Sequence, residues 1–584
     1  MFRKFFCAAL SVAVVVGGLL ASSVRAEDAQ IDGKSYRKLS VAEYRDKMKG
    51  GWIGQIAGVC WGAPTEFRWC NRMIPENELP EWTPEMINNA FGQDDLYVEM
   101  TFLRSMEEHG LDVSLRQAGI DFANSEYALW HANLCGRTNL RAGIAPPNSS
   151  HPAFNKCADD IDYQIEADFS GLISPGLPNN AVLMGEKFGR LMNYGDGVYA
   201  GQFVGAMYSE AFFETDVVKI IEKALEAIPA ESQYAEMVRD VLQWKEEYPD
   251  NFEDCWHKIN EKYQLNPAYR QWSCSGVDSD FNIDAKINGA YILVGLLYGN
   301  GDLDETIKIS IRCGQDSDCN PSNAGGVLFT TLGFSALPPR FSEKLDETKV
   351  FSHTAYNFPA LLDVCESLAT QAIEKEGGFV REEDGERYFY IPRTEVKPSA
   401  LTSCAAPTDK PVEGPDATFS EEELAKIKFR TYTAETALDK FFMGFRASHM
   451  GSDMAPGYRE TYRGKENVFM THPESRDVGA ILSKTMRVPQ NATMEFFVSH
   501  HLSGDQIGDY ELIVRVDGEE RVRTIVSKDS VGEDGWQKIK LQLGEMDEDN
   551  ESGYKDYFIE IVNQPNGWSW EAMYIADLNF YAVL

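Results

Sequence analysis

The stretch that decides the fold of the first half of the chain is Gly314-Gln315-Asp316-Ser317-Asp318-Cys319-Asn320-Pro321-Ser322-Asn323-Ala324-Gly325-Gly326. Two carboxylates stand two residues apart. Asn320 and Pro321 then follow, and these residue types are favoured at a helix N-cap and at the first helical position. The run after them is apolar and rich in small residues. The sequence therefore predicts that Asp316 and Asp318 lie on a tight loop at the N-terminus of a buried helix.

This position favours ionised carboxylates, because a helix N-terminus offers free backbone N–H groups and the positive end of the helix dipole. Carboxylate oxygens suit a hard cation such as Mg²⁺ better than they suit a general acid. An isolated pair of this kind more often serves only as a helix cap. A second acidic pair upstream, Asp94-Asp95, also opens a predicted helix and makes a metal site the competing interpretation.

If the fold brings the two helix starts together, four carboxylates meet in one place. Their mutual repulsion then demands cations. Two Mg²⁺ ions would satisfy this demand and would polarise a substrate oxygen and activate water. The four residues are Asp94, Asp95, Asp316 and Asp318.

A glycine-rich helix is predicted near the start of the chain. Ser40 is a suitable N-cap with Glu43 three residues later, and the helix runs to about residue 62. Glycines at positions 51, 54, 58 and 62 lie on roughly one face, which lets another backbone approach closely. Pro64 ends the helix and leaves Glu66 on the loop beyond it.

With 584 residues, the chain is too long for one hydrophobic core, so several domains are expected. Residues 40–375 show helical patterns without convincing alternating strands, although Cys135–Asn139 has the composition of a polar turn. The pattern becomes period two after about residue 440, as in Tyr510–Val516, which is typical of a β-sandwich. The predicted fold class is multidomain α and β, an all-α helical bundle followed by a β-sandwich of jelly-roll type. The predicted segments are a signal peptide (1–26), an N-terminal arm (27–39), the all-α domain (40–375), an acidic Pro-containing linker with one short helix at Ser420 (376–440) and the sandwich (441–584).

The N-terminus is typical of a secretory signal peptide. Arg3 and Lys4 precede an apolar run, and Val24-Arg25-Ala26 offers a cleavage site after Ala26. The run is too short for a confident membrane span, with an uncleaved anchor as the alternative. We therefore expect a secreted or periplasmic protein with no membrane span after signal cleavage.

Composition narrows the possible partners. The net charge of −36 disfavours nucleic acid and anionic membranes, because phosphate contacts need clustered Lys and Arg.

The eleven cysteines are scattered and form no C-x-x-C pair, so the fold is not built on disulfides, although export permits them. The pattern does not predict which cysteines pair or what the oligomeric state is.

Three segments in order resemble the ADP-ribosylglycohydrolase family: Gly62-Ala63-Pro64-Thr65-Glu66-Phe67, the Asp94-Asp95 pair, and Gly314–Asp318 before its small-residue helix. The likeness spans about residues 40–375. It implies an all-α domain that binds two Mg²⁺ ions and hydrolyses the glycosidic bond at the anomeric carbon of ADP-ribose.

The resemblance also implies roles for individual residues. Glu66 would sit beside the metals and the scissile bond. We expect Glu66 to handle the proton, with Asp95 and Asp316 sharing in catalysis. The family usually has Thr where this chain has Gln93, whose amide oxygen can still bind a cation, and Thr where it has Cys319, a poor ligand for a hard cation. The implied ligands of Mg²⁺, or alternatively of Mn²⁺, are Gln93, Asp94, Asp95, Asp316 and Asp318.

The loops that would face the ligand depart from the family pattern. Asp168 opens the segment that matches the family's middle region, and a Gly-Asp turn at residues 195–196 precedes a further glycine-rich helix. We expect substrate contacts from Asp168, Gly195, Asp196 and Tyr199.

Together these features predict a secreted, metal-dependent hydrolase that cleaves the glycosidic bond of an ADP-ribose-like or other sugar. The partner would be a small-molecule or glycan substrate. One alternative is a glycoside hydrolase acting on an extracellular glycan or a nucleoside. A different class, a non-catalytic carbohydrate-binding protein with a decayed site, is the other. The sandwich would position a glycan or pack on the catalytic domain.

Overall fold

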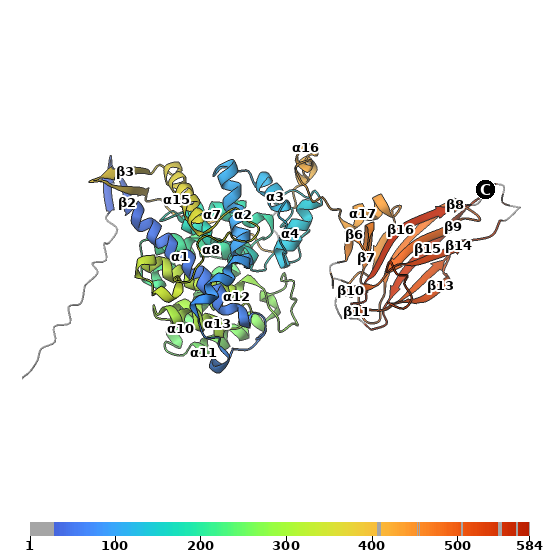
Figure 1. Ribbon diagram of the computed structural model, residues 1–584, viewed down its shortest axis with the longest axis horizontal. Coiled ribbons are helices and arrows are strands. Elements are labelled where there is room, and N and C mark those ends of the chain that lie inside the picture. The colour runs from blue at the N-terminus through green and yellow to red at the C-terminus, as the bar shows by residue number, and fades with distance from the viewer. Residues whose placement is uncertain are drawn as a thin grey trace, which may run out of the picture.

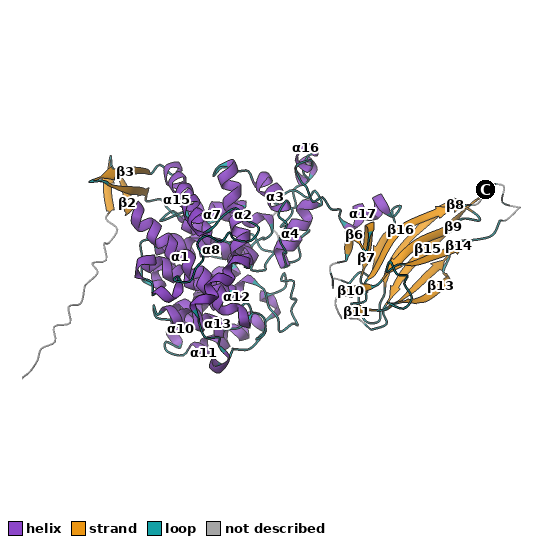
Figure 2. Ribbon diagram, viewed as in Figure 1, coloured by secondary structure: helices purple, strands orange, loops and turns teal. Residues whose placement is uncertain are grey.

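The computed structural model describes residues 28–405, 410–451, 454, 456–503, 506–546, 550, 552–567 and 570–582. The predicted signal peptide lies outside these residues. Helices fill the N-terminal part and antiparallel strands fill the C-terminal part (Figures 1 and 2), which confirms the predicted fold class. Within this described part, no helix combines the length and the apolar character that crossing a membrane requires.

The helical domain covers the range 40–375, in which the sequence predicted helices. Its α-helices are α1 (Val41–Gly62), α2 (Asp94–His109), α3 (Leu115–Ala123), α4 (His131–Arg141), α5 (Asp162–Ile165), α6 (Asp168–Leu172), α7 (Pro178–Lys187), α8 (Asp196–Ala211), α9 (Val217–Ala224), α10 (Gln233–Glu247), α11 (Phe252–Ile259), α12 (Ala285–Tyr298), α13 (Leu303–Arg312), α14 (Cys319–Leu332) and α15 (Phe358–Lys375).

Helix α1 packs directly along α14 through its glycines. A Cβ atom added at Gly54 would lie 2.3 Å from the Gly325 carbonyl oxygen, and one at Gly58 would lie 2.2 Å from that of Pro321. The glycines whose added Cβ would meet another backbone recur every four residues, at positions 50, 54, 58 and 62. The sequence analysis placed position 51 on this line, but a Cβ at Gly51 would instead meet side chains of α14 and α6.

Replacing Gly58 with alanine is expected to lower the free energy of unfolding of the helical domain by about 3 kcal/mol, the upper end of typical overpacking. The new methyl group would overlap backbone atoms of Pro321, which cannot move independently of α14. Urea denaturation followed by far-UV circular dichroism measures the change. Gly92→Ala is the matched control, since a Cβ there meets nothing within 4 Å. Equal stability of the two variants would contradict the predicted backbone contact.

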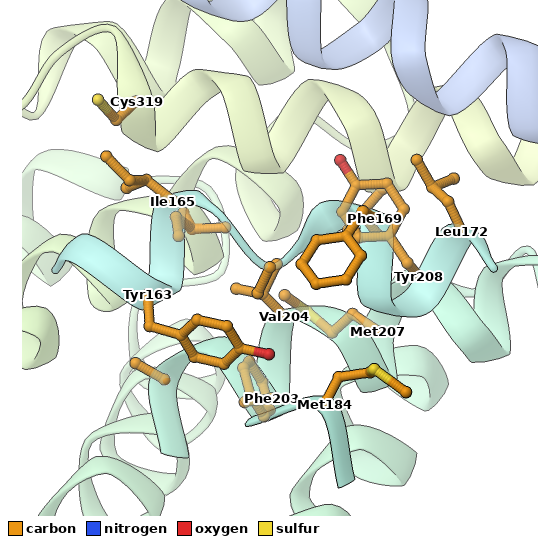
Figure 3. Packing of buried hydrophobic residues seen from close by; sticks show 14 of the residues in the cluster. Tyr163, Ile165, Phe169, Leu172, Met184, Phe203, Val204, Met207, Tyr208 and Cys319 are labelled. Carbon is orange, nitrogen blue, oxygen red and sulfur yellow. The ribbon is translucent and has the colours of Figure 1, made fainter. Parts of the chain in front are cut away.

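A packed apolar cluster supports the middle of α14, where the Tyr208 ring approaches Gly326. Figure 3 shows Phe169 and Leu172 of α6 packed with Val204 and Tyr208 of α8, and all four side chains are buried. Cys319, the first residue of α14, lies at the edge of the same cluster. Since a close-packed core has little free volume, this packing holds α14 in a fixed position.

The predicted N-terminal arm and linker contain more regular structure than the sequence indicated. Strands β1 (Asp28–Ile31) and β2 (Lys34–Ser40) join β3 (Phe379–Glu383) and β4 (Glu386–Pro392) in one sheet of order β1-β2-β4-β3. Phe389 of β4 pairs with Leu39 and both are buried in the core of the helical domain. The short helix predicted at Ser420 is present as α16 (Glu421–Leu424), with Ser420 and Glu423 forming a capping box.

The polar turn predicted at Cys135–Asn139 is wrong, because these residues lie within α4. Gly136 faces another segment closely, and a Cβ there would lie 2.6 Å from the Leu191 carbonyl oxygen. Arg137 is buried and donates to the Tyr127 carbonyl oxygen at 2.7 Å. These polar and small residues serve tertiary contacts, which a local pattern cannot reveal.

The C-terminal sandwich consists of two five-stranded antiparallel sheets in the described residues, ordered β13-β12-β15-β8-β5 and β14-β9-β16-β7-β6, with a separate β10-β11 hairpin. Alternate side chains of β12, including Leu512 and Val514, are buried in its core. Helix α17 (Ala434–Phe441) packs on the same core. The strands are β5 (Arg446–Ser448), β6 (Gly457–Tyr462), β7 (Lys465–Thr471), β8 (Ala480–Pro489), β9 (Thr493–Ser499), β10 (His501–Ser503), β11 (Gln506–Gly508), β12 (Tyr510–Val516), β13 (Glu519–Val526), β14 (Gln537–Gln542), β15 (Tyr554–Gln564) and β16 (Met573–Tyr581).

Candidate metal centre

The Asp316–Asp318 loop joins α13 to α14, and its second aspartate caps the helix. Asp318 Oδ1 accepts a hydrogen bond from the Cys319 backbone N–H at 3.1 Å. The predicted cap, Asn320, lies inside the first turn, where its side chain donates to Asn288 Oδ1 at 2.9 Å. That assignment was wrong because the helix starts earlier, where the carboxylate of Asp318 reaches the first free N–H.

The structure brings the second acidic pair to the same place. Gln93 is the N-cap residue of α2, and Asp94 and Asp95 form its first turn. The Cys319 thiol lies 3.3 Å from Asp95 Oδ2 and accordingly joins the start of α14 to the start of α2. Two helix N-termini that are more than two hundred residues apart in sequence therefore present their carboxylates to one another.

Glu66 belongs to the same group because the loop after α1 is tied to the Asp316 loop. The hydroxyl oxygens of Thr65 and Ser317 are 2.8 Å apart, and the Phe67 N–H donates to the Gln315 carbonyl oxygen at 3.1 Å. The sequence analysis assigned no role to the two hydroxyl residues. The only feature of the sequence that could have indicated them is their position. Thr65 directly precedes Glu66, and Ser317 lies between Asp316 and Asp318.

A cavity of about 490 Å³ opens above this acidic group. Glu66, Asp94 and Asp316 line it together with Gln93 and the Cys319 thiol. The aromatic side chains of Phe67, Tyr97, Trp130 and Phe281 also line the cavity. Asp95 and Asp318 are buried behind the lining residues and complete the cluster from within.

Burial is the main cause that raises the pKa of every aspartate in this cluster. It raises the pKa of Asp316 to about 7, with a further contribution from Glu66 and Asp95. It raises the pKa values of Asp95 and Asp318 well above the usual range, and neighbouring aspartates add to both shifts. Among the described residues, no Lys, Arg or His forms an ion pair with any of them. No basic side chain in the described part of the chain therefore pairs with these carboxylates to offset their charge.

Glu66 faces the cavity, yet the surrounding walls reduce its hydration. Burial, followed by the charges of Asp318 and Asp94, raises the pKa of Glu66 to about 8. No side-chain hydrogen bond fixes this carboxyl among the described contacts, and the group is therefore free to turn toward a molecule in the cavity.

Comparison with known families identifies the helical domain. A family model for ADP-ribosylglycohydrolases matches residues 40–376, more than half of the chain. The chain belongs to the ADP-ribosylglycohydrolase family. This confirms the resemblance read from the three sequence segments, and membership in this family indicates an activity of the glycosyl hydrolase type.

Individual known proteins are only distantly similar. No significant match was found among curated proteins. A solved structure described as an ADP-ribosylglycohydrolase-related protein complex is 14% identical, with 56% of this chain and 97% of that chain covered and a TM-score of 0.36. A structure of carbohydrate-binding modules from the β-sandwich superfamily is 16% identical, with 25% of this chain and 59% of that chain covered and a TM-score of 0.18. At these scores neither likeness carries an argument about function.

The acidic cluster of this family member fits a hard divalent cation. Asp95 Oδ1 is buried and has no hydrogen-bond partner among the described residues. An orphaned carboxylate oxygen beside three further carboxylates is costly unless a proton or a cation binds it. The predicted donors are all oxygen atoms, which suits Mg²⁺ and also Mn²⁺. The soft Cys319 thiol stands at the edge of the donor set, where the family usually has Thr.

The four predicted substrate contacts lie elsewhere in this domain. Asp168 accepts hydrogen bonds from Tyr208 and, at 2.7 Å, from Asn323, deep in the core. Asp196 accepts the Tyr234 N–H at 2.8 Å, and the Tyr199 hydroxyl donates to the Ala400 carbonyl oxygen at 2.8 Å. Gly195 has a positive φ of 55° and forms the turn before α8. Since α8 is a core helix, the structure brings none of the four predicted contacts to the described lining of the cavity.

A further part of the cavity wall was missed by the sequence analysis. It comes from the start of α4 and from the loop before α12, and it includes Trp130, His131 and Phe281. Asp162 supports the start of α4, because its carboxylate accepts the N–H groups of Ala132 at 3.1 Å and Asn133 at 2.9 Å. The isolated aromatic residues could not be assigned to a cavity before the fold was known.

Proposed function

We propose that the helical domain is a metal-dependent hydrolase that cleaves a glycosidic bond at the anomeric carbon of an ADP-ribose-like or other sugar. The single observation that supports this most is the convergence of four uncompensated carboxylates beside a cavity of about 490 Å³. A cavity of this size lies within the range of small-molecule sites in proteins, roughly 300–1,000 Å³. Membership in the ADP-ribosylglycohydrolase family supports the same reaction type.

The proposed roles follow from where each side chain lies. Asp94, Asp95, Asp316 and Asp318 would hold the cations, with the Gln93 amide oxygen as a further ligand. When bound, Mg²⁺ would supply Lewis-acid activation of a substrate hydroxyl or of water. Glu66 is the most exposed acidic residue of the cavity and is assigned the transfer of a proton to or from the scissile bond.

A neutral substrate, such as a nucleoside or an uncharged glycoside, is the second candidate. The described residues that line the cavity include no Lys and no Arg to bind a pyrophosphate. The aromatic wall instead offers stacking surfaces, with Trp130 52% exposed and the Phe67 and Phe281 rings 5.0 Å apart edge to face. Such surfaces bind the face of a base or a sugar ring without regard to charge.

A substrate panel tests the proposed function. ADP-ribose conjugates, nucleosides and neutral glycosides are incubated with the purified protein, with Mg²⁺ and with EDTA. Release of a free reducing sugar that requires Mg²⁺ is the expected result. Preference for ADP-ribose conjugates supports the first candidate substrate, and preference for nucleosides or neutral glycosides supports the second. Hydrolysis that survives both EDTA and the Asp94→Ala substitution would overturn the metal-dependent mechanism.

Glu66→Gln is expected to lower kcat for the substrate found in this panel by roughly 10²–10⁴-fold, the usual contribution of general acid–base catalysis. The amide keeps the size of the side chain but cannot transfer the proton. Binding of Mg²⁺, measured by calorimetry, should change little. Glu222→Gln on the exposed face of α9 is the matched control. Unchanged kcat in Glu66→Gln would remove Glu66 from the mechanism.

Export and a glycan partner complete the proposal. The signal-like segment 1–26 supports secretion or transport to the periplasm. Peptide mass spectrometry of the exported protein should find a mature N-terminus at Glu27.

In the sandwich, Trp570 is 36% exposed and stacks on His501 with ring centroids 5.4 Å apart, which supports a role in positioning a glycan.

A further inference from the structure

A group of soft metal ligands lies beside the cavity, apart from the acidic cluster. His131 Nδ1 is 3.0 Å from the sulfur of Cys274. Ligand atoms of His131, Asp160 and Cys274 all lie within 4.8 Å of one another. The Cys157 thiol lies next to these three, close enough to interact electrostatically with Asp160 and Cys274, and would become a fourth ligand after a small movement.

The carboxylate in this group has no positive partner. Asp160 is buried, and its two oxygens accept the backbone N–H of Cys274, each at the long distance of 3.3 Å. Among the described residues, no Lys or Arg forms an ion pair with it. A buried carboxylate without a cation is strongly unfavourable. A bound metal ion would compensate its charge and use the nearby imidazole and thiols as further ligands.

We propose that His131, Cys157, Asp160 and Cys274 bind one Zn²⁺ ion. Zn²⁺ binds sulfur at about 2.3 Å and nitrogen or oxygen at about 2.0–2.2 Å in a tetrahedron, which places neighbouring ligand atoms about 3–4 Å apart. The 3.0 Å contact between His131 and Cys274 is consistent with that spacing. Thiolate and imidazole ligands select Zn²⁺ over Mg²⁺, so the site differs in kind from the all-oxygen cluster.

The ion would hold together three segments that form one wall of the cavity. His131 starts α4, Cys157 and Asp160 lie before α5, and Cys274 lies on the loop before α12. The last two segments already touch, since the Ile161 N–H donates to the Ile283 carbonyl oxygen at 3.1 Å. Four protein ligands leave no open position, as in structural zinc sites. The site would therefore fix the shape of the substrate wall rather than take part in the reaction.

The backbone of His131 supports this assignment. Its φ of 47° lies in the left-handed region, which costs of order 1–3 kcal/mol for a non-glycine residue. Such strain persists only where other contacts hold the residue in place. Coordination through the imidazole would supply that contact and would orient His131 at the edge of the cavity.

A disulfide is the competing state of one ligand. The sulfur of Cys135 is 3.6 Å from that of Cys157, close enough for the two thiols to pair after a small movement. Pairing would remove Cys157 from the zinc ligands. The two outcomes differ in metal content and in the number of free thiols, which makes them easy to separate.

The test measures zinc in the full-length mature protein, purified without chelator, by plasma mass spectrometry. One zinc ion per chain is expected, and exchange with Co²⁺ should produce the thiolate-to-metal absorption of a tetrahedral site. Cys274→Ser and His131→Ala should lower the zinc content at least tenfold. Because Cys274 is exposed, its substitution leaves the core intact.

Two controls make the result specific. Asp316→Asn in the acidic cluster and Cys70→Ser, a half-buried thiol bonded to the Phe67 carbonyl oxygen at 3.3 Å, should both keep the zinc. Wild-type protein without zinc and without the cobalt–thiolate bands would overturn the proposal. So would a Cys135–Cys157 disulfide found in metal-free protein, or unchanged zinc in Cys274→Ser. If a variant does not fold, the cobalt spectrum of the wild type decides.

Discussion

The effect of Asp316→Asn on the free energy of unfolding is expected to change sign when Mg²⁺ is added. In metal-free buffer the variant should be at least as stable as the wild type, because it removes one of several buried, mutually repelling carboxylates. In Mg²⁺ it should be less stable, since the wild type gains about 2.7 kcal/mol at a concentration of 100 times Kd and the variant gains little. Activity should fall by about 10³-fold, which corresponds to the several kcal/mol that a catalytic metal supplies.

Thermal unfolding in EDTA and in Mg²⁺ measures this reversal. Asp250→Asn, an exposed aspartate outside the cluster, is the control and should respond to Mg²⁺ as the wild type does. A variant that is destabilised equally in both buffers would show that Asp316 has a structural role only. In that case the cation-binding interpretation of the cluster would fail.

Lys286→Met is expected to lower the free energy of unfolding by about 3–5 kcal/mol, the typical loss when one partner of a buried ion pair is removed. The lysine nitrogen lies 3.2 Å from Asp284 Oδ1 and 3.4 Å from Asp159 Oδ2, and its side chain is 1% exposed. Asp196 also interacts with it. Methionine fills a similar volume but leaves the three buried carboxyl groups without a positive charge.

Chemical denaturation of the helical domain measures this loss. Lys308→Met is the matched control, because that lysine is 36% exposed and pairs with Glu305 at 2.9 Å on the helix surface. Exposed pairs contribute about 0–1 kcal/mol, so the control should change little. A small effect at Lys286 would mean that the three aspartates need no counter-charge from this lysine.

The acidic centre could be predicted because each of its parts has a local signature. An acidic pair at a helix start, a glycine stripe of period three to four and a proline after the helix are all visible within a few residues. Their convergence was the step that needed the fold. The sequence analysis stated it as a condition, under which repulsion between the carboxylates would demand cations. The start of α14 was misplaced because Asp318 and Asn320 are both good caps, and the choice depends on the buried partner Asn288.

The cavity wall could not be predicted because only tertiary contacts bring its residues together. Asp168 and Asp196 look like candidate ligand contacts in sequence, yet the first bonds to Tyr208 and the second to the Tyr234 N–H. Trp130 and His131, which do line the cavity, follow no pattern that separates them from core residues. The strands β3 and β4 were read as part of a linker for a similar reason, since their partner β2 lies more than three hundred residues earlier.

The glycine contact between α1 and α14 has a consequence for how new specificities can evolve in this chain. The two helices touch backbone to backbone, so a side chain added at Gly54, Gly58 or Gly62 would displace the carboxylate-bearing loops as a unit. The aromatic wall, by contrast, is built from side chains on separate segments. Single substitutions there can change the shape of the cavity without disturbing the acidic centre. Selection can thus vary the substrate while the chemistry is inherited unchanged.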